Sequence, residues 1–132
     1  MKKRLPMGKL KAKADRAMQD YFRRIKTHCE LCPNPYQVAH HFIWKSQSNY
    51  LRYDEKDLIF ICTKWHSKFH AFPDPTYPIK VANLRGPAWV AYIEKHKRLL
   101  KSDNRAELEE IIKKYSWKTE RQAVKEFIEK YA

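Results

Sequence analysis

The chain has 132 residues, enough for one compact domain with a modest hydrophobic core. Its 28 lysines and arginines outnumber its 15 acidic residues, and the formal net charge of +13 predicts a polyanionic partner, because binding to phosphates releases counterions. No stretch approaches the roughly 18 consecutive apolar residues of a membrane span, so no membrane association is expected. The basic start of the chain lacks the apolar segment of a secretion signal, which predicts a cytoplasmic protein with reduced thiols.

The N-terminal part is expected to form a basic tail and then an amphipathic helix. Residues 1–7 lack periodicity, whereas apolar residues recur at three- and four-residue steps over 8–27, the spacing of one helix face. Basic residues largely fill the other faces, so this helix could pack on the core and still contact phosphates with its flank. The apolar positions are Leu10, Ala14, Ala17, Met18, Tyr21, Phe22 and Ile25.

Cysteines, histidines and short β-prone runs replace this periodicity between residues 28 and 72. Residues 36–43 and 58–61 are predicted to be two strands, separated by a polar loop over 45–56. Residues 62–71 suit a short helix.

The C-terminal half is predicted to be mostly helical. It begins with a proline-rich segment over 72–87, which is expected to be an irregular surface connection. Three helices should follow, the first of them running to about residue 101. Their candidate first or capping residues are Pro87, then Ser102 or Asp103, then Ser116 or Thr119.

Four of the six histidines lie within residues 40–70 and form two pairs with different geometry. His66 and His70 are four residues apart, so a helix places both imidazoles on one face, where they can ligate one cation. His40 and His41 are adjacent, so a strand points them to opposite sides and only one faces the helix pair squarely. Either pair alone has ordinary structural explanations. Together, in a strongly basic chain, they indicate a metal site.

Four motifs follow one another in this segment: Cys29-x2-Cys32, His40-His41-Phe42, Asp57-Leu58-x3-Cys62 and His66-x3-His70. Over residues 29–70, about a third of the chain, their order resembles the HNH nucleases, also called the ββα-metal or His-Me finger superfamily. Residues 48–54 look like the loop of phage-encoded HNH proteins associated with recombination. The resemblance implies an α+β fold, a ββα-metal core with flanking helices. The single domain then comprises a tail and helix (1–27), the core (28–72), and the connection with C-terminal helices (73–132).

The resemblance also implies roles for individual residues. In this family the second histidine of the pair, here His41, is the general base that takes a proton from the attacking water. His40 stands where relatives place a metal ligand, and His66 and His70 would complete the site for one divalent metal. Asp57 corresponds by spacing to the family's middle Asn, which braces the loop bearing the base or helps to bind metal. Imidazole donors favour Mn²⁺, Ni²⁺, Co²⁺ or Zn²⁺, and Mg²⁺ remains an option if Asp57 contributes.

Many relatives close a structural zinc site with two Cys-x2-Cys pairs. Here Cys29 and Cys32 form the first pair and Cys62 begins the second, but Trp65 stands at the fourth position, and an indole cannot ligate zinc. Either another donor, with His28 the nearest, completes a structural zinc site, or zinc is absent and the cysteines are buried. In the second case Trp65 fills the volume and holds the segment together by packing.

The expected activity is metal-dependent hydrolysis of DNA phosphodiester bonds, as in phage-type recombination or DNA processing. Arg52 and Lys64 lie near the motifs and, with Arg23 and Arg24 of the basic helix, are candidate DNA contacts, although ordinary surface charge is preferred for Lys64. One alternative is a DNA-binding or recombination accessory module that kept the HNH scaffold without cleavage. A histidine-rich metal-handling protein is another, and the net charge argues against it. The sequence indicates no particular protein partner.

Overall fold

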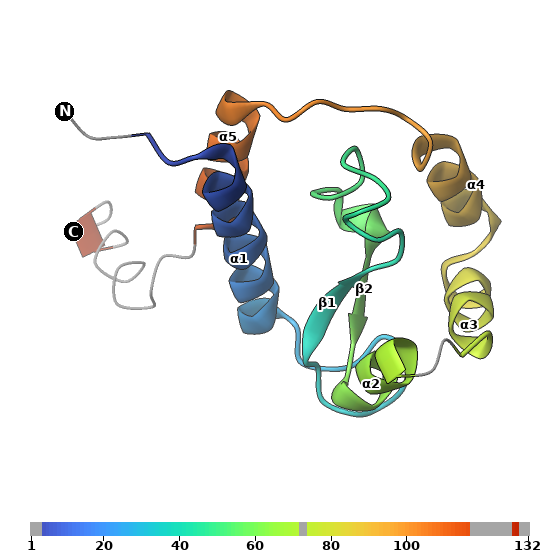
Figure 1. Cartoon of the computed structure of the whole chain (residues 1–132). Helices are drawn as coiled ribbons and strands as arrows, with labels where there is room; N and C mark the ends of the chain where they lie inside the picture. Colours follow the sequence, from blue (N-terminus) through green and yellow to red (C-terminus); the bar gives the residue numbers. More distant parts are fainter. Residues whose placement is uncertain (1–3, 72–73, 117–127, 130–132) are drawn as a thin grey trace.

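Five α-helices surround a small two-stranded antiparallel sheet in the part of the chain described by the computed structural model, residues 4–71, 74–116 and 128–129 (Figure 1). The predicted α+β class is confirmed. The elements are α1 (Met7–Ile25), β1 (Val38–His41), a 3₁₀ turn η1 (Glu55–Asp57), β2 (Leu58–Ile61), α2 (Thr63–Ala71), α3 (Thr76–Arg85), α4 (Pro87–His96) and α5 (Arg105–Tyr115).

Helix α1 matches the amphipathic helix predicted over 8–27. It buries one residue in every four, so a single stripe faces the protein interior. Helix α5 lies along this stripe, with Leu108 against its first half and Tyr115 against its second half. The stripe consists of Leu10, Ala14, Met18 and Phe22.

Both predicted strands are present and pair with each other in an antiparallel arrangement, although β1 is shorter than the strand expected over 36–43. Pairing ends at His41, because the amide of Ile43 donates to the side chain of Asp57 instead of to a strand backbone, at 2.8 Å. The register places Val38 opposite Ile61, Ala39 opposite Phe60, His40 opposite Ile59 and His41 opposite Leu58.

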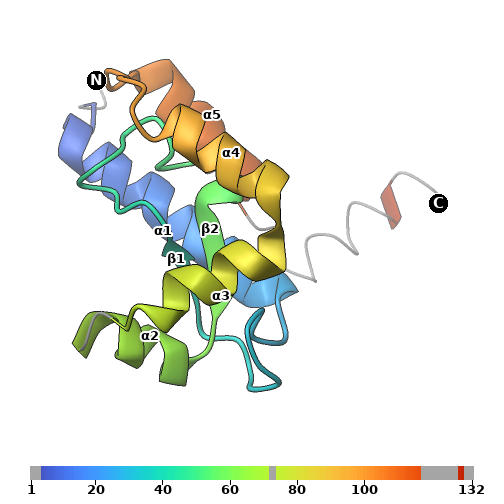
Figure 2. The same cartoon turned by 90° about the vertical axis from the view of Figure 1, so that its right-hand side faces the viewer.

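The sheet separates two packing clusters. Helices α1 and α5 lie on one side of it and α3 and α4 on the other, with α2 near one end (Figures 1 and 2). We call the first the α1 cluster, whose buried members are Met18, Phe22, Ala39, Leu58 and Tyr115. We call the second the α3 cluster, whose buried members are Cys29, Leu31, Ile59, Ile61, Cys62, Trp65, Tyr77 and Val81.

The prediction of an irregular connection over 72–87 is wrong, because α3 occupies most of it. Its prolines lie at the helix start: Pro75 precedes the first turn and Pro78 lies within it, where a missing amide costs no intrahelical bond. Asp74 accepts hydrogen bonds from the first two amides of the helix. Gly86, at φ 90°, then separates α3 from α4.

The C-terminal boundaries also differ from prediction. Helix α4 ends at His96 rather than near residue 101, and the following segment crosses over to α1 (Figure 1). Asn104, rather than Ser102 or Asp103, caps α5, because its side chain accepts from the Glu107 amide at 3.1 Å. Asp103 instead forms an ion pair with Lys11.

The last predicted helix, from Ser116 or Thr119, falls outside the described residues apart from 128 and 129. In the part of the chain that is described, no helix combines the length and apolar character needed to cross a membrane.

Candidate metal and general-base site

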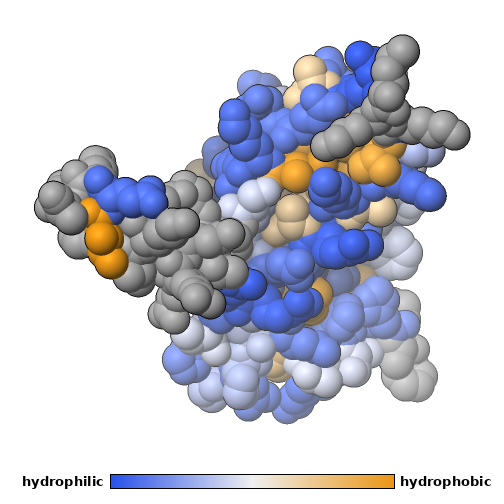
Figure 3. Space-filling model, turned by 90° about the vertical axis from the view of Figure 1, so that its left-hand side faces the viewer, coloured by the Kyte–Doolittle hydropathy of each residue, from blue (hydrophilic) through white to orange (hydrophobic). Residues whose placement is uncertain are grey.

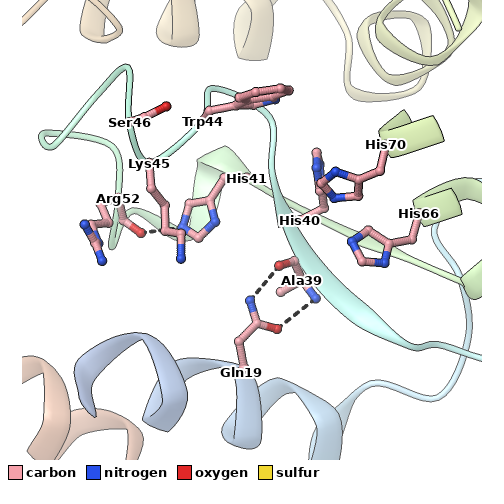
Figure 4. Close-up of a pocket in the computed structure, with 10 residues that line it drawn as sticks. All are labelled: Gln19, Ala39, His40, His41, Trp44, Lys45, Ser46, Arg52, His66 and His70. Atoms are coloured by element: carbon pink, nitrogen blue, oxygen red, sulfur yellow. Dashed lines mark hydrogen bonds between the residues drawn. The ribbon is translucent and has the colours of Figure 1, made fainter. Parts of the chain in front are cut away.

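A cavity of about 560 Å³ opens between α1, the end of β1 and α2 (Figure 4). It contains all four histidines that the sequence singled out, from segments up to 30 residues apart. The lining residues are Gln19, Ala39, His40, His41, Trp44, Lys45, Ser46, Arg52, His66 and His70.

Three of these imidazoles face one another. The ring centroid of His40 lies 5.9 Å from that of His66 and 5.5 Å from that of His70, and the latter two lie 4.5 Å apart. His66 and His70 therefore share one face of α2, and His40 is the member of its pair that faces them, as strand alternation requires. The Nδ1 atom of His40 lies 3.3 Å from the hydroxyl of buried Tyr77, which leaves Nε2 for a ligand in the cavity.

The electrostatic environment favours the neutral form of His40 and His66. Burial lowers the pKa of His40 to about 3, and the neighbouring His70 and His66 contribute to this shift. Burial and His70 also lower the pKa of His66. Metal ligation requires the deprotonated imidazole nitrogen, so this environment suits a ligand set at neutral pH.

The three imidazoles do not yet form a closed ligand set. Among the described residues, the cysteine trio alone brings three potential ligand atoms within 4.8 Å of one another. Rotation of the histidine side chains would have to bring their nitrogens closer around an ion.

His41 lies on the other side of β1 and has a different environment. Its Nε2 donates to the backbone carbonyl oxygen of Arg52 at 2.7 Å, which leaves Nδ1 as a proton acceptor (Figure 4). Burial is the largest influence on this ring and lowers its pKa. A neutral imidazole in a defined tautomer can take a proton from water.

Asp57 is fully buried and does not line the cavity. Its Oδ1 accepts from the Ile43 amide at 2.8 Å, and its backbone oxygen accepts from the Phe42 amide at 2.8 Å. The structure thus places Asp57 against the chain that directly follows His41, which corresponds to the bracing role and not to metal ligation. Its Oδ2 has no hydrogen-bond partner among the described residues, and burial raises its pKa to about 8.

The cysteines form a separate cluster. The sulfur atoms of Cys29, Cys32 and Cys62 all lie within 4.8 Å of one another, with 3.6 Å between those of Cys32 and Cys62. Trp65 is buried in the same hydrophobic cluster as Cys29 and Cys62. His28 is exposed and is not a member of the group.

No family model matches the chain, and neither does any curated protein or solved structure.

The candidate DNA contacts have different surroundings. Arg52 lines the cavity, but its guanidinium forms an ion pair with Asp15 of α1. Arg23 and Arg24 are exposed near the end of α1, and Lys64 is exposed at the start of α2, all outside the cavity lining. Figure 3 shows the face that includes α1 and α5, where hydrophilic residues predominate. DNA binding by these four residues stays a prediction.

Several residues around the histidines were missed by sequence reasoning. Trp44 and Lys45 follow the histidine pair closely, and that proximity could have marked them. Asp15, Gln19 and Tyr77 lie 20 or more residues from the residues that they bind, and nothing in the local pattern distinguishes them. Their partners are Arg52, Ala39 and His40.

Proposed function

We propose that the protein is a metal-dependent DNA endonuclease of the HNH type, in which β1, β2 and α2 form the ββα-metal core. The observation that carries this proposal is that one cavity holds two different histidine environments. Three imidazoles face one another, while the fourth, His41, is held in one tautomer by a backbone carbonyl. The charge of +13 favours nucleic acid as the partner.

The proposed reaction is hydrolysis of a phosphodiester. Nδ1 of His41 accepts a proton from water as the water oxygen bonds to phosphorus, and the bond from phosphorus to the 3′ oxygen breaks. His40, His66 and His70 would hold one divalent cation, which when bound supplies Lewis-acid stabilisation at the phosphate and the departing oxygen. The donor set fits Mn²⁺, Ni²⁺, Co²⁺ or Zn²⁺ better than Mg²⁺, because Asp57 does not line the cavity.

A nicking assay tests the proposal. Supercoiled plasmid is incubated with wild type, His41→Ala, or the matched control His96→Ala, in Mg²⁺, Mn²⁺ or Ni²⁺. His96 is suited to this comparison because it lies on α4, stacked on Tyr92. Loss of the base should slow nicking by about 100-fold or more, with DNA affinity retained, whereas the control should nick like wild type.

Two results would contradict this assignment. Undiminished nicking by His41→Ala, after contaminating nucleases are excluded, removes His41 as the base. Tight DNA binding by wild type with no cleavage in any of these metals favours the accessory module.

A second, structural metal is also proposed. The cysteine cluster supports Zn²⁺ bound by Cys29, Cys32 and Cys62, with the fourth position left to a ligand from outside this trio. Burial opposes ionisation of Cys62, but the Trp65 amide and the neighbouring thiols lower its pKa overall, which favours the thiolate that zinc needs. Burial raises the pKa of Cys29, so that thiol would ionise only on metal binding. Purified protein should then contain one zinc that Cys32→Ser loses. If metal analysis finds none and a chelator leaves Tm unchanged, the cysteines are packing residues only.

A further inference from the structure

Helix α1 binds the strand that carries His41. The side-chain amide of Gln19 donates to the backbone oxygen of Ala39 at 2.7 Å and accepts from its amide at 3.1 Å (Figure 4). These two groups belong to the edge of β1 that β2 does not cover, so Gln19 satisfies them where a third strand would. Ala39 lies two residues before His41, and both lie on the same side of the strand.

One turn earlier, α1 binds the loop that orients His41. Asp15 and Gln19 are four residues apart, so both side chains leave the same helix face. The Asp15 carboxylate forms a bidentate pair with Arg52: Oδ1 accepts from Nε at 3.1 Å and Oδ2 accepts from Nη2. The two side chains are only 17% and 16% exposed, and a two-bond pair of this kind fixes orientation as well as distance.

Arg52 is the residue whose carbonyl binds Nε2 of His41. One face of α1 therefore contacts the surroundings of His41 at two places. Gln19 binds the strand that carries His41, and Asp15 binds Arg52, whose carbonyl orients the His41 ring. We propose that Asp15 and Gln19 are positioning residues for His41, and that Arg52 acts through its backbone with its side chain as the anchor. This inference rests on the proposed role of His41 as the general base.

The anchor matters because the Arg52 carbonyl belongs to a long connection. Sixteen residues, 42–57, join the paired strands, and Trp44 to Gln47 are exposed. The neighbouring Tyr53 also binds α1, through its hydroxyl and the Lys11 carbonyl at 3.1 Å, but Asp15 is the α1 residue that holds Arg52 itself. Without Asp15 the Arg52 carbonyl is held less firmly, and the His41 ring has a less fixed partner. Misplacement of a catalytic group by about 1 Å can slow a reaction on the order of 100-fold.

A competing explanation gives Asp15 a purely electrostatic role. Its Oδ2 also lies 3.6 Å from Nζ of Lys45, so Asp15 neutralises two cations at the cavity. Removal of Asp15 should then tighten DNA binding, since both cations become available to phosphates. Under this explanation kcat would stay constant or rise. Under the positioning proposal kcat falls even if binding tightens.

The test uses the full chain and five variants: Asp15→Ala, Gln19→Ala, Arg52→Ala, the double variant Asp15→Ala/Arg52→Ala and the control Asp20→Ala. Asp20 is an exposed residue of the same helix, paired with Arg23 at the surface. The first readout is NMR of the metal-free protein, in which the Nε2 proton of His41 is visible if its hydrogen bond slows exchange with water. The second is nicking, analysed as kcat and KM, and the third is DNA affinity at fixed salt.

Asp15→Ala should speed exchange of the His41 proton at least 10-fold and lower kcat on the order of 10- to 100-fold, with KM equal or lower. Arg52→Ala should speed proton exchange and lower kcat alike, but with KM equal or higher, because it removes a cavity cation instead of freeing one. The Asp15→Ala/Arg52→Ala double variant should lower kcat no more than either single one, because the pair acts as a unit. Gln19→Ala should also lower kcat, and Asp20→Ala should leave proton exchange and kcat unchanged.

Three outcomes overturn the proposal. The first is proton exchange and kcat in Asp15→Ala within twofold of wild type. The second is tighter DNA binding without a fall in kcat, which leaves only the electrostatic role. The third is simultaneous loss of amide protection throughout β1, which makes Asp15 a general stability residue. If wild type itself cleaves nothing, the proposed function fails, while the exchange measurement still decides whether Asp15 positions the ring.

Discussion

Replacing Asp57 by Asn should change how the stability of the fold depends on pH. Asp57 is fully buried, one of its oxygens accepts from the Ile43 amide, and the other has no hydrogen-bond partner in the described part of the chain. Burial raises its pKa from 3.8 to about 8, so the folded protein holds this carboxyl in its neutral form near neutral pH. Asn has nearly the same shape and keeps the acceptor oxygen, but it does not titrate.

The sign and size follow from proton linkage. Between pH 3.8 and about 8 the unfolded state has lost this proton and the folded state has kept it. The free energy of unfolding therefore falls as pH rises, by up to about 1.4 kcal/mol per pH unit. From about pH 5 to about pH 8 the wild type should lose up to about 4 kcal/mol relative to Asp57→Asn.

The comparison between the two proteins is the informative measurement. His40 and His41 have lowered pKa values, so their contribution to stability increases with pH and partly masks the Asp57 effect in wild type. Their contribution cancels in the difference between wild type and Asp57→Asn, measured by urea unfolding at several pH values. A difference that stays constant within about 0.5 kcal/mol from pH 5 to pH 8 would show that Asp57 is ionised in the folded protein, contrary to this reasoning.

Three further predictions concern single side chains. Tyr77→Phe removes the hydroxyl beside Nδ1 of His40 and should weaken Mn²⁺ binding about 10-fold by calorimetry; unchanged affinity would mean that the hydroxyl does not orient the ring. Asn104→Ala should cost about 1 kcal/mol through loss of the α5 cap, whereas Ser102→Ala should cost almost nothing; equal losses in urea unfolding would contradict the cap assignment. Gly86 has a φ of 90°, which strains a residue that carries a Cβ, but an added Cβ would have no atom within 4 Å. Gly86→Ala should therefore lower stability by about 1–3 kcal/mol, from backbone strain alone. An unchanged Tm would refute that.

The parts of the fold that sequence predicts well are those in which one local pattern decides the outcome. The four-residue repeat that begins at Leu10 defines a buried helix stripe, and the spacing of His66 and His70 defines one helix face. Strand alternation likewise assigns His40 and His41 to opposite sides of β1, and their different hydrogen-bond partners agree with that assignment. These patterns bring four histidines to one cavity.

The parts that sequence does not predict depend on contacts between distant segments. Proline content suggests an irregular connection, but the position of Pro78 within the first turn makes it compatible with α3, and α3 supplies the hydroxyl beside His40. The spacing of Asp57 leaves bracing and metal ligation equally open, and only its burial away from the cavity separates them. The bond from Asp15 to Arg52 joins residues 37 positions apart, with no local signal at either end.

Strand β1 lies between two hydrophobic clusters, so the two halves of the proposed chemistry depend on different parts of the fold. His40 contacts the hydroxyl of Tyr77 in the α3 cluster. The edge of β1 beside His41 is hydrogen-bonded to Gln19 of α1. Under the proposed function, substitutions that disrupt the α3 cluster should release the catalytic metal while leaving His41 in place. Substitutions on the α1 side should displace His41 but leave the metal bound, so that the protein retains metal without activity. Inactive variants of this protein should accordingly sort into two kinds, distinguishable by metal content alone.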